Sequence, residues 1–264
     1  MRFAQKIIWI AGASSGIGES LVYAFIKEGA TVIASAPFVD QLNKVKENCG
    51  DKKEFCEVLP LDMQQSENFP DLVEWVVSKY KRIDLLIFVA GISQRAIVQE
   101  TSMETVRKIM EINFFGAVAL TNAVLPVMLK QGGGQIAATS SIVGKFGFPL
   151  RSMYSASKHA LHGFFESLQA ENLKNNIQVT LIIPGRVQTE ISSNALTGDG
   201  KVWGKKDPGL EDGISKEKAV KIILNAIYRK KKEVLVGGRE LGMVYIKRFC
   251  PRLFWKMVSR IKST

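Results

Sequence analysis

The stretch "KIIWIAGASSGIGES", residues 6–20, decides the fold. An apolar run typical of a buried strand leads into a turn with Gly12, Gly16 and Gly18, and a helical pattern follows. Glycines suit such a turn because a side chain would block both the tight bend and the approach of a pyrophosphate to backbone N–H groups. The positive end of the following helix then faces the phosphates. The stretch predicts a dinucleotide-binding strand–turn–helix, with an ordinary tight turn as the alternative.

Apolar runs alternate with helix-length segments along the rest of the chain. Most runs are nearly continuous in apolar residues, as expected for parallel strands covered on both faces. The alternation predicts an α/β fold: one doubly wound (Rossmann) domain with a seven-stranded parallel sheet and helices on both faces. We place this domain at 1–240, including a substrate loop at about 190–215, and a basic amphipathic tail at 241–264. The seven runs are 6–12, 31–36, 55–62, 83–91, 134–141, 177–185 and 233–238.

The composition is that of a folded globular protein. Of the 264 residues, 46% are hydrophobic and 23% are charged. No uninterrupted apolar run reaches the roughly 18 residues of a membrane span, and a strand pattern so close to Met1 leaves no room for a signal peptide. Three cysteines, odd in number and without metal-ligand spacing, indicate free thiols in a reducing compartment. We therefore expect a cytoplasmic protein.

The net charge of +11 is concentrated in one segment. Residues 229–264 hold 11 Lys or Arg and 2 Asp or Glu, so that the first 228 residues carry only +2. A near-neutral body argues against a nucleic-acid partner. The tail mixes aromatic and basic residues, which indicates either contact with the inner face of a membrane or docking on a neighbouring subunit. Pro251 is expected to interrupt any single helix there.

The end of the second strand run bears on the choice of dinucleotide. An NAD site usually has an acidic residue at this point to bind the ribose 2′-hydroxyl, but this run ends "ASAPF". The sequence therefore favours NADP, with NAD as the alternative. No arginine is near to hold a 2′-phosphate, and Ser14, Ser15 and Ser35 are the candidates to bind it. Asp62, after the third run, is predicted to accept from the adenine amino group, to cap the next helix, or both.

Tyr154 and Lys158 lie four residues apart in a predicted helix and so share one face. A nearby cation favours the phenolate and lowers the pKa of a tyrosine, which suits it to acid–base work near neutral pH. The spacing alone is also common in ordinary helices. Ser140 and Ser141 end the fifth run at the carboxyl edge where open α/β sheets bind ligands, and Asn113 lies on the preceding helix pattern.

Taken together, these motifs resemble the short-chain dehydrogenase/reductase family in its compact single-domain form. The resemblance covers about residues 6–238, and within the family the tail and "SSIVGKFGFPLRSMYSASKHALHGFFESL" are most similar to reductases of hydroxysteroids and lipid ketones. The sequence departs from the family's pattern at Phe88-Val89, where two asparagines are common. The matching elements, in the family's order, are "GASSGIG" at 12–18, "AG" at 90–91, Asn113, Ser141, "YSASK" at 154–158 and "PG" at 184–185.

The resemblance implies a ketone/alcohol oxidoreductase with a small, hydrophobic carbonyl substrate, assembled as a homodimer or homotetramer. Tyr154 would exchange the proton, Ser141 would orient the oxygen, Lys158 would lower the pKa of Tyr154 and hold the nicotinamide ribose, and Asn113 would hold a water of the proton relay. The catalytic set is Asn113, Ser141, Tyr154 and Lys158. The cofactor-binding set is Gly12, Ser14, Ser15, Gly16, Ile17, Gly18, Ser35, Asp62, Ala90, Gly91, Tyr154, Lys158, Pro184, Gly185 and Thr189.

Other residues leave alternatives open. Arg186 either draws an anionic group to the substrate mouth or is simply solvated. The loop carrying Leu196, Trp203 and Leu210 is either an apolar lid or a loose surface loop. His159 and His162 have no carboxylate or cysteine at ligand spacing, so we interpret them as packing or interface residues and predict no metal.

Two other functions compete with the oxidoreductase. One is a sugar-nucleotide epimerase or dehydratase, although those chains are usually longer and have a differently spaced glycine motif. The other is a catalytically weak NADP-binding regulatory or scaffold protein of the same fold. Such proteins tend to lose members of the reactive set, which is complete in this chain.

Overall fold

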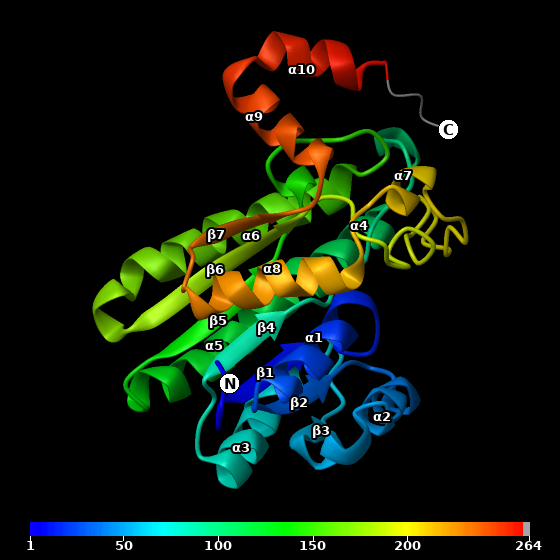
Figure 1. The fold of residues 1–264 in the computed structure, drawn as a ribbon. Helices are drawn as coiled ribbons and strands as arrows, with labels where there is room; N and C mark the ends of the chain where they lie inside the picture. The colour runs from blue at the N-terminus through cyan, green and yellow to red at the C-terminus, as the bar shows by residue number, and fades with distance from the viewer. Residues whose placement is uncertain (261–264) are drawn as a thin grey trace.

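The structure is a computed structural model that describes residues 1–260, without the side chains of Pro208 and Leu210. Within this range seven parallel strands form one sheet in the order β3-β2-β1-β4-β5-β6-β7 (Figure 1). The predicted doubly wound sheet is confirmed, and each strand falls inside its predicted run. The strands are β1 Ile7–Ala11, β2 Thr31–Ser35, β3 Cys56–Val58, β4 Leu85–Phe88, β5 Gly134–Thr139, β6 Ile177–Pro184 and β7 Glu233–Val236.

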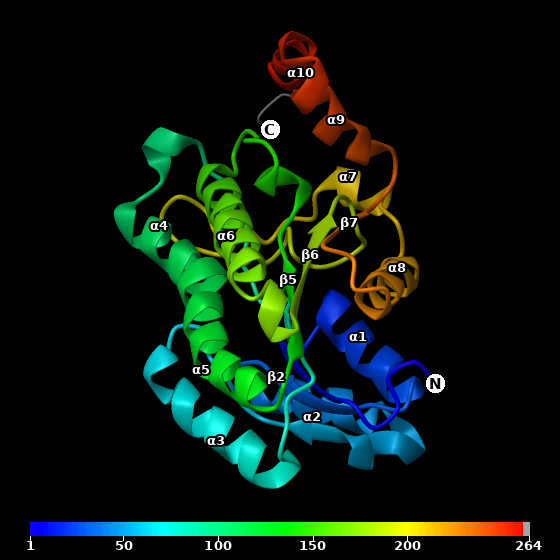
Figure 2. The same cartoon turned by 90° about the vertical axis from the view of Figure 1, so that its left-hand side faces the viewer.

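Helices cover both faces of the sheet, which explains why the strands are apolar on both sides (Figure 2). One face packs against α1 (Gly16–Lys27), α2 (Val39–Glu47) and α8 (Lys216–Tyr228). The opposite face packs against α3 (Phe69–Tyr80), α5 (Gly116–Lys130) and α6 (Ser152–Glu171). From β1 the strand order runs outward to β3 on one side and from β4 to β7 on the other, so the topological switch point lies between β1 and β4. Open α/β sheets bind ligands at the carboxyl ends of the strands at such a point.

A π-helical segment, Glu111–Phe115, joins α4 (Met103–Met110) to α5. By length and composition the continuous helix Met103–Lys130 is apolar enough to cross a membrane, although charged residues interrupt its apolar runs. Buried side chains of α5 belong to the core beneath the sheet. The core helix of a soluble protein can have the same length and composition, so these two properties are weak evidence for a membrane span.

Two short helices, α9 (Gly242–Phe249) and α10 (Pro251–Val258), lie beyond the carboxyl edge of the sheet (Figure 1). The break at Pro251 is the predicted one. Phe254 of α10 is fully buried and packs edge-on against Phe146, with ring centroids 5.1 Å apart. The tail is therefore docked on the segment between β5 and α6; its last residues, 261–264, lie outside the described part of the chain.

Candidate active site

The turn between β1 and α1 leaves room for a ligand where the sequence predicts one. Gly12 has φ +94°, and a side chain there would collide with the backbone of Ala90. A Cβ at Gly18 would collide with the carbonyl oxygen of Gly12. Gly16 has φ +59°, which favours glycine, and a Cβ there would make ordinary van der Waals contact with the Thr189 side chain, 3.5 Å away. The turn therefore needs glycine at Gly12 and Gly18 to avoid collisions and at Gly16 for its backbone conformation.

The polar residues around this turn differ in what they offer a cofactor. Ser15 is the N-cap residue of α1, and its hydroxyl makes no capping hydrogen bond. Ser15 is exposed, while Ser14 and Ile17 are partly exposed beside it. Ser35 is different: it is fully buried, and its hydroxyl accepts a hydrogen bond from the Trp9 indole over 2.9 Å. The prediction that Ser35 binds a 2′-phosphate is therefore wrong, because its side chain points into the core.

Asp62 lies after β3 and remains partly exposed at the same edge of the sheet. Its Oδ1 accepts from the backbone N–H of Gln64 over 3.0 Å. The next α-helix, α3, has Asn68 as its N-cap, so the alternative prediction of a helix cap is wrong. The other carboxylate oxygen has no hydrogen-bond partner among the described residues.

The predicted reactive residues come together at the carboxyl ends of β4 and β5. Tyr154 and Lys158 are buried on one face of α6, at 8% and 3% exposure, and the lysine Nζ lies 5.7 Å from the centroid of the tyrosine ring. Nζ donates to the carbonyl oxygen of Thr139, at the end of β5, over 2.8 Å. The Ser141 hydroxyl donates to the Pro184 carbonyl over 3.4 Å and is close enough to Tyr154 to lower the pKa of its phenol.

The pKa values of this pair are set mainly by burial. Burial raises the pKa of Tyr154, and the Ser141 hydrogen bond, Arg151 and Arg95 oppose that rise. Burial lowers the pKa of Lys158 to about 8. The expectation that Lys158 lowers the pKa of Tyr154 is therefore not met in this structure. Burial raises this pKa by more than the nearby cations lower it, and those cations are Arg151 and Arg95.

Asn113 sits in the π-helical segment and is held on three sides. Its Oδ1 accepts from the Ile92 N–H over 2.8 Å, and its Nδ2 donates to the Ile92 carbonyl and to the Ser157 hydroxyl over 2.9 and 3.0 Å. Gly91 is wedged beside it: a Cβ there would lie 3.1 Å from Asn113 Oδ1 and 3.3 Å from Lys158 Nζ. Ala90 and Gly91 are thus the backbone that separates the glycine turn from Asn113 and Lys158.

The Pro184–Gly185 turn after β6 is held by a residue that the sequence analysis missed. Glu240 Oε1 accepts from the backbone N–H groups of Arg186 and Gly238 over 2.7 and 3.0 Å. Burial raises the pKa of Glu240, but these hydrogen bonds outweigh it and lower the pKa overall. Arg186 itself is exposed, in agreement with the solvated alternative. A lone glutamate outside any motif gives no sequence signal for this role.

The loop at 190–215 is attached to the body of the protein, so it is not a loose surface loop. Leu196 exchanges backbone hydrogen bonds with Ser93 and Arg95, over 2.9 and 2.8 Å. Asp207 forms ion pairs with the buried Arg95 and with Arg151. The Leu210 side chain, predicted to belong to the lid, lies outside the described part of the structure. Through Arg151, the N-cap residue of α6, the loop is tied to the helix that carries Tyr154.

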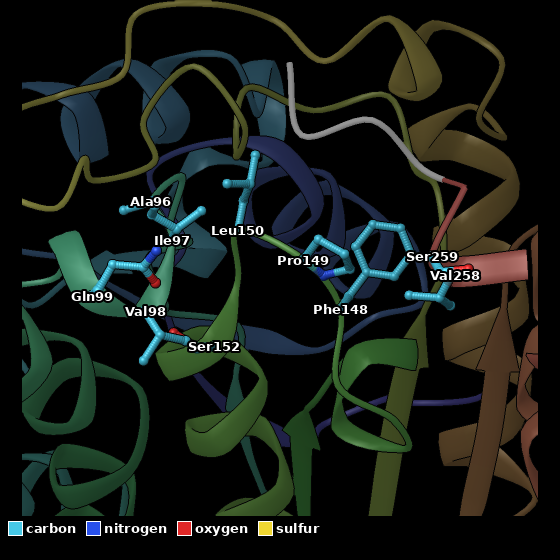
Figure 3. Close-up of a pocket in the computed structure, with 10 residues that line it drawn as sticks. All are labelled: Ala96, Ile97, Val98, Gln99, Phe148, Pro149, Leu150, Ser152, Val258 and Ser259. Carbon is cyan, nitrogen blue, oxygen red and sulfur yellow. The ribbon is translucent and has the colours of Figure 1, made fainter. Parts of the chain in front are cut away.

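A pocket of about 380 Å³ opens beside this lid (Figure 3). Its walls come from the segment after β4, the segment before α6 and the C-terminal end of α10. Phe148, Pro149 and Leu150 lie between Ile97 and Val258 in this view. The pocket is mostly apolar, and the tail forms one of its walls.

His162 has carboxylate neighbours, contrary to the sequence interpretation. Its Nδ1 lies 3.5 Å from Glu166 Oε1, and Glu233 completes a group of three possible metal ligands. Lys145 already pairs with Glu233 over 2.6 Å. On the other side, Nε2 lies 2.9 Å from the Ser140 hydroxyl, which donates to the Lys158 carbonyl. His162 thus connects α6 to the end of β5. His159 is exposed.

An open glycine turn at the switch point, with a buried serine, tyrosine and lysine at the carboxyl edge of the same sheet, defines a class: dinucleotide-dependent oxidoreductases built on the Rossmann fold. A family model described as short chain dehydrogenase matches residues 6–199. The chain belongs to the short-chain dehydrogenase/reductase family.

Individual relatives agree with this assignment. A Drosophila melanogaster protein, dehydrogenase/reductase SDR family protein 7-like, is 41% identical over 97% of this chain and 80% of its own length. A Shigella flexneri short-chain dehydrogenase solved with NADP is 26% identical, with a TM-score of 0.77 over 89% of this chain and 98% of its own. A Burkholderia phymatum short-chain dehydrogenase/reductase solved with NAD shares the fold at 18% identity, with a TM-score of 0.84 over 96% of each chain.

Proposed function

We propose that the protein interconverts a ketone and a secondary alcohol, with Tyr154 as the general acid and base. The observation that carries this proposal is the convergence of Ser141, Tyr154 and Lys158 on one edge of the sheet, next to the glycine turn. Tyr154 is almost fully buried, and the Ser141 hydroxyl is close enough to act on the pKa of its phenol. A carbonyl oxygen placed between these two hydroxyls would receive a hydrogen bond from each and the proton from Tyr154.

The nicotinamide dinucleotide would supply the hydride. The residues present fit such a cofactor: Gly16 is the first residue of α1, at its positive end, and has no side chain to cover the backbone N–H groups, and Thr189 lies across from it. Lys158 is buried on the same face of α6 as Tyr154 and is placed to bind the ribose hydroxyls. Glu240 keeps the Pro184–Gly185 turn in a fixed position, where its backbone would orient the nicotinamide.

We further propose that NADP is preferred to NAD. Solved proteins of this fold carry one cofactor or the other, so the choice rests on this chain's own residues. β2 ends without a carboxylate to repel a 2′-phosphate, and the Ser15 hydroxyl is uncommitted. Direct titration with NADPH and NADH tests this, and tighter binding of NADH would contradict it.

The assignment of Tyr154 is tested by Tyr154→Phe, assayed with a panel of ketones by NADPH absorbance. Turnover is expected to disappear while NADPH binding is kept, because the ring stays and only the hydroxyl is lost. Unimpaired turnover in the variant would refute the role of Tyr154. A wild-type protein that binds NADPH but reduces no ketone in a broad panel would favour the regulatory alternative.

We also propose that the cytoplasmic protein contacts anionic membrane surfaces through α9 and α10. The segment 242–260 has no acidic residue, and apolar side chains are exposed among its cations, as in helices that bind the membrane interface. The exposed apolar residues are Tyr245, Phe249, Leu253, Trp255 and Met257. The cations are Lys247, Arg248, Arg252, Lys256 and Arg260.

Sedimentation with vesicles tests this proposal on the full chain. The wild type is expected to sediment with phosphatidylserine vesicles and not with phosphatidylcholine vesicles, and the double variant Phe249→Ser/Leu253→Ser is expected to stay in the supernatant. If the wild type binds neither kind of vesicle and forms a dimer that the double variant splits, the tail is a subunit contact instead.

A further inference from the structure

Arg95 is a buried arginine whose position is fixed by several hydrogen bonds. It follows β4 and is 7% exposed. Its Nη1 donates to the Gln94 carbonyl and the Ser93 hydroxyl over 2.6 and 3.0 Å, and its Nε donates to Asp207 Oδ1 over 3.1 Å. Arg95 Nη2 pairs with the other oxygen of Asp207. Nearly all of its donors are therefore committed to protein atoms.

Arg151 stands next to Arg95 but keeps free donors. It is the N-cap residue of α6, three positions before Tyr154, and its Nη2 lies 2.6 Å from Asp207 Oδ2. Among the described residues neither its Nε nor its Nη1 has an acceptor. A quarter of the side chain is exposed. Its guanidinium lies 5.1 Å from the centroid of the Phe148 ring, which lines the pocket. Phe148 is thus shared between the Arg151 guanidinium and the pocket, and Leu150 and Ser152, the two neighbours of Arg151 in the chain, line the same pocket.

The backbone before Arg151 is strained in a way that fixes its position. Leu150 has φ +62°, a left-handed conformation that is costly for a branched residue and that accumulates at functional sites. The Leu150 carbonyl accepts from the Ala96 N–H over 3.2 Å, and Arg151 forms a bridge with Ala96. The segments that carry the two arginines are therefore joined directly to each other.

The charges of this cluster do not balance. Two guanidinium groups share one carboxylate, Asp207, which leaves one net positive charge at a mostly buried site. An unpaired buried cation is unfavourable, and a second anion with hydrogen-bond acceptors would relieve it. Arginine suits this role because its planar fork matches the oxygens of a carboxylate or phosphate.

We infer that Arg151, supported by Arg95, binds an anionic group on the substrate, a carboxylate or a phosphate, while the apolar part of the substrate lies in the neighbouring pocket (Figure 3). This inference rests on the proposed ketone chemistry and names the class of ketone. Asp207 on the lid contacts the same guanidinium groups, so it competes with the substrate anion and also holds the lid in place.

Matched substrate pairs test the inference on the full-length protein. The first pair is γ-oxodecanoate and its methyl ester; the second is the phosphate ester of α-hydroxydecanone and the free hydroxyketone. For each pair the ratio of kcat/KM between the anionic and the neutral ketone is measured with NADPH. In the wild type this ratio is expected to be about ten or more for at least one pair, mainly through KM, because a charge-assisted hydrogen bond contributes about 1.5–3 kcal/mol. The pair with the larger ratio identifies the anion.

Variants then locate the anion site. Arg151→Gln is expected to bring the ratio close to one and Arg151→Lys to give an intermediate ratio, while Asp207→Asn should raise it by removing the competing carboxylate. Arg229→Gln, an exposed arginine at the end of α8, is the matched control and should leave the ratio unchanged. Because each ratio is taken within one protein, a general effect of Arg151 on Tyr154 cancels.

The outcomes separate this inference from the proposed function. Equal turnover of charged and neutral ketones by the wild type would overturn the inference and leave the reductase assignment intact. A ratio that survives Arg151→Gln, with kcat lowered equally for both substrates, would show that the arginines serve only the tyrosine. Turnover of none of the four ketones, charged or neutral, would contradict the proposed function and the inference with it.

Discussion

Lys158 is expected to lower the stability of the folded protein, so that Lys158→Met should be more stable than the wild type near neutral pH. The side chain is 3% exposed, and among the described residues its Nζ has one hydrogen-bond acceptor, the Thr139 carbonyl. Burial lowers the pKa of Lys158 from 10.5 to about 8. A charge that is harder to hold in the folded state than in the unfolded state favours unfolding.

The magnitude follows from the size of this change. A fall in pKa from 10.5 to about 8, at about 1.36 kcal/mol for each pH unit, gives a destabilisation of about 3 kcal/mol when the lysine is charged in both states. Methionine has a similar length and removes this penalty, but it leaves the Thr139 carbonyl without its donor, which costs about 1 kcal/mol. Lys158→Met should therefore raise the free energy of unfolding by about 2 kcal/mol at pH 7.

The pH dependence gives the sharper test. Between about pH 8 and 10.5 the unfolded lysine holds a proton that the folded lysine has lost, so wild-type stability rises with pH over this window. The stability difference between Lys158→Met and the wild type should therefore shrink by about 1 kcal/mol from pH 7 to pH 9. Groups such as Tyr23 and Cys56, whose pKa values burial raises to about 12, change stability in the opposite direction. They cancel when the two proteins are compared at each pH.

Urea denaturation of both proteins at the two pH values measures these differences. Lys221→Met, on the exposed face of α8, controls for the loss of a lysine as such. A stability difference between Lys158→Met and the wild type that is the same at pH 7 and pH 9 would refute the reasoning, because it would mean that the folded lysine does not lose its proton in this window. Loss of turnover in the same variant would agree with the proposed role of Lys158, and it is independent of the stability result.

Two further substitutions have clear structural expectations. Gly18→Ala should reduce NADPH affinity by about tenfold or more while the far-ultraviolet circular dichroism stays native, because its Cβ would collide with the Gly12 carbonyl and distort the turn; unchanged affinity would contradict the assignment of the phosphate site. Phe254→Ala should destabilise the docked state of the tail by up to about 3 kcal/mol, because it removes the contact with Phe146. Tryptic cleavage within the tail should then be faster. Phe249→Ala, at an exposed position, is the control, and equal cleavage rates in the two variants would show that the tail is not held by Phe254.

The sequence predicts those parts of the fold and site that depend on neighbouring residues. The strands follow from continuous apolar runs, the glycine turn from its place between a strand and a helix, and the shared face of Tyr154 and Lys158 from the helical period. All three are observed. Ser35 shows the limit of such reasoning. It alternates in step with Ile33, which packs in the same cluster as Trp9, but the sequence does not say which face of a doubly covered strand a polar residue meets.

Partners that are distant in sequence were missed for a physical reason. Asp207 lies 112 residues from Arg95 and 56 from Arg151, and the ion pairs form because the lid returns across the ends of two strands. Glu240 reaches Arg186 from the segment after β7 in the same way. The direction of the Tyr154 pKa shift was misjudged because burial depends on the whole fold and exceeds the effect of any one cation.

Residues that lie in short motifs and residues that lie outside them have different consequences for function. The residues that would carry the proton and the hydride are fixed by short motifs, so related chains can share them and still act on different substrates. The residues that line the pocket belong to the segment after β4, the segment before α6 and the tail, and Asp207 beside them belongs to the loop at 190–215; none of these segments carries a motif. In this chain they bring together an apolar pocket and a pair of arginines with one unbalanced positive charge. Comparing ketones that differ only in charge is therefore more informative about this protein than a search among ketones of similar shape.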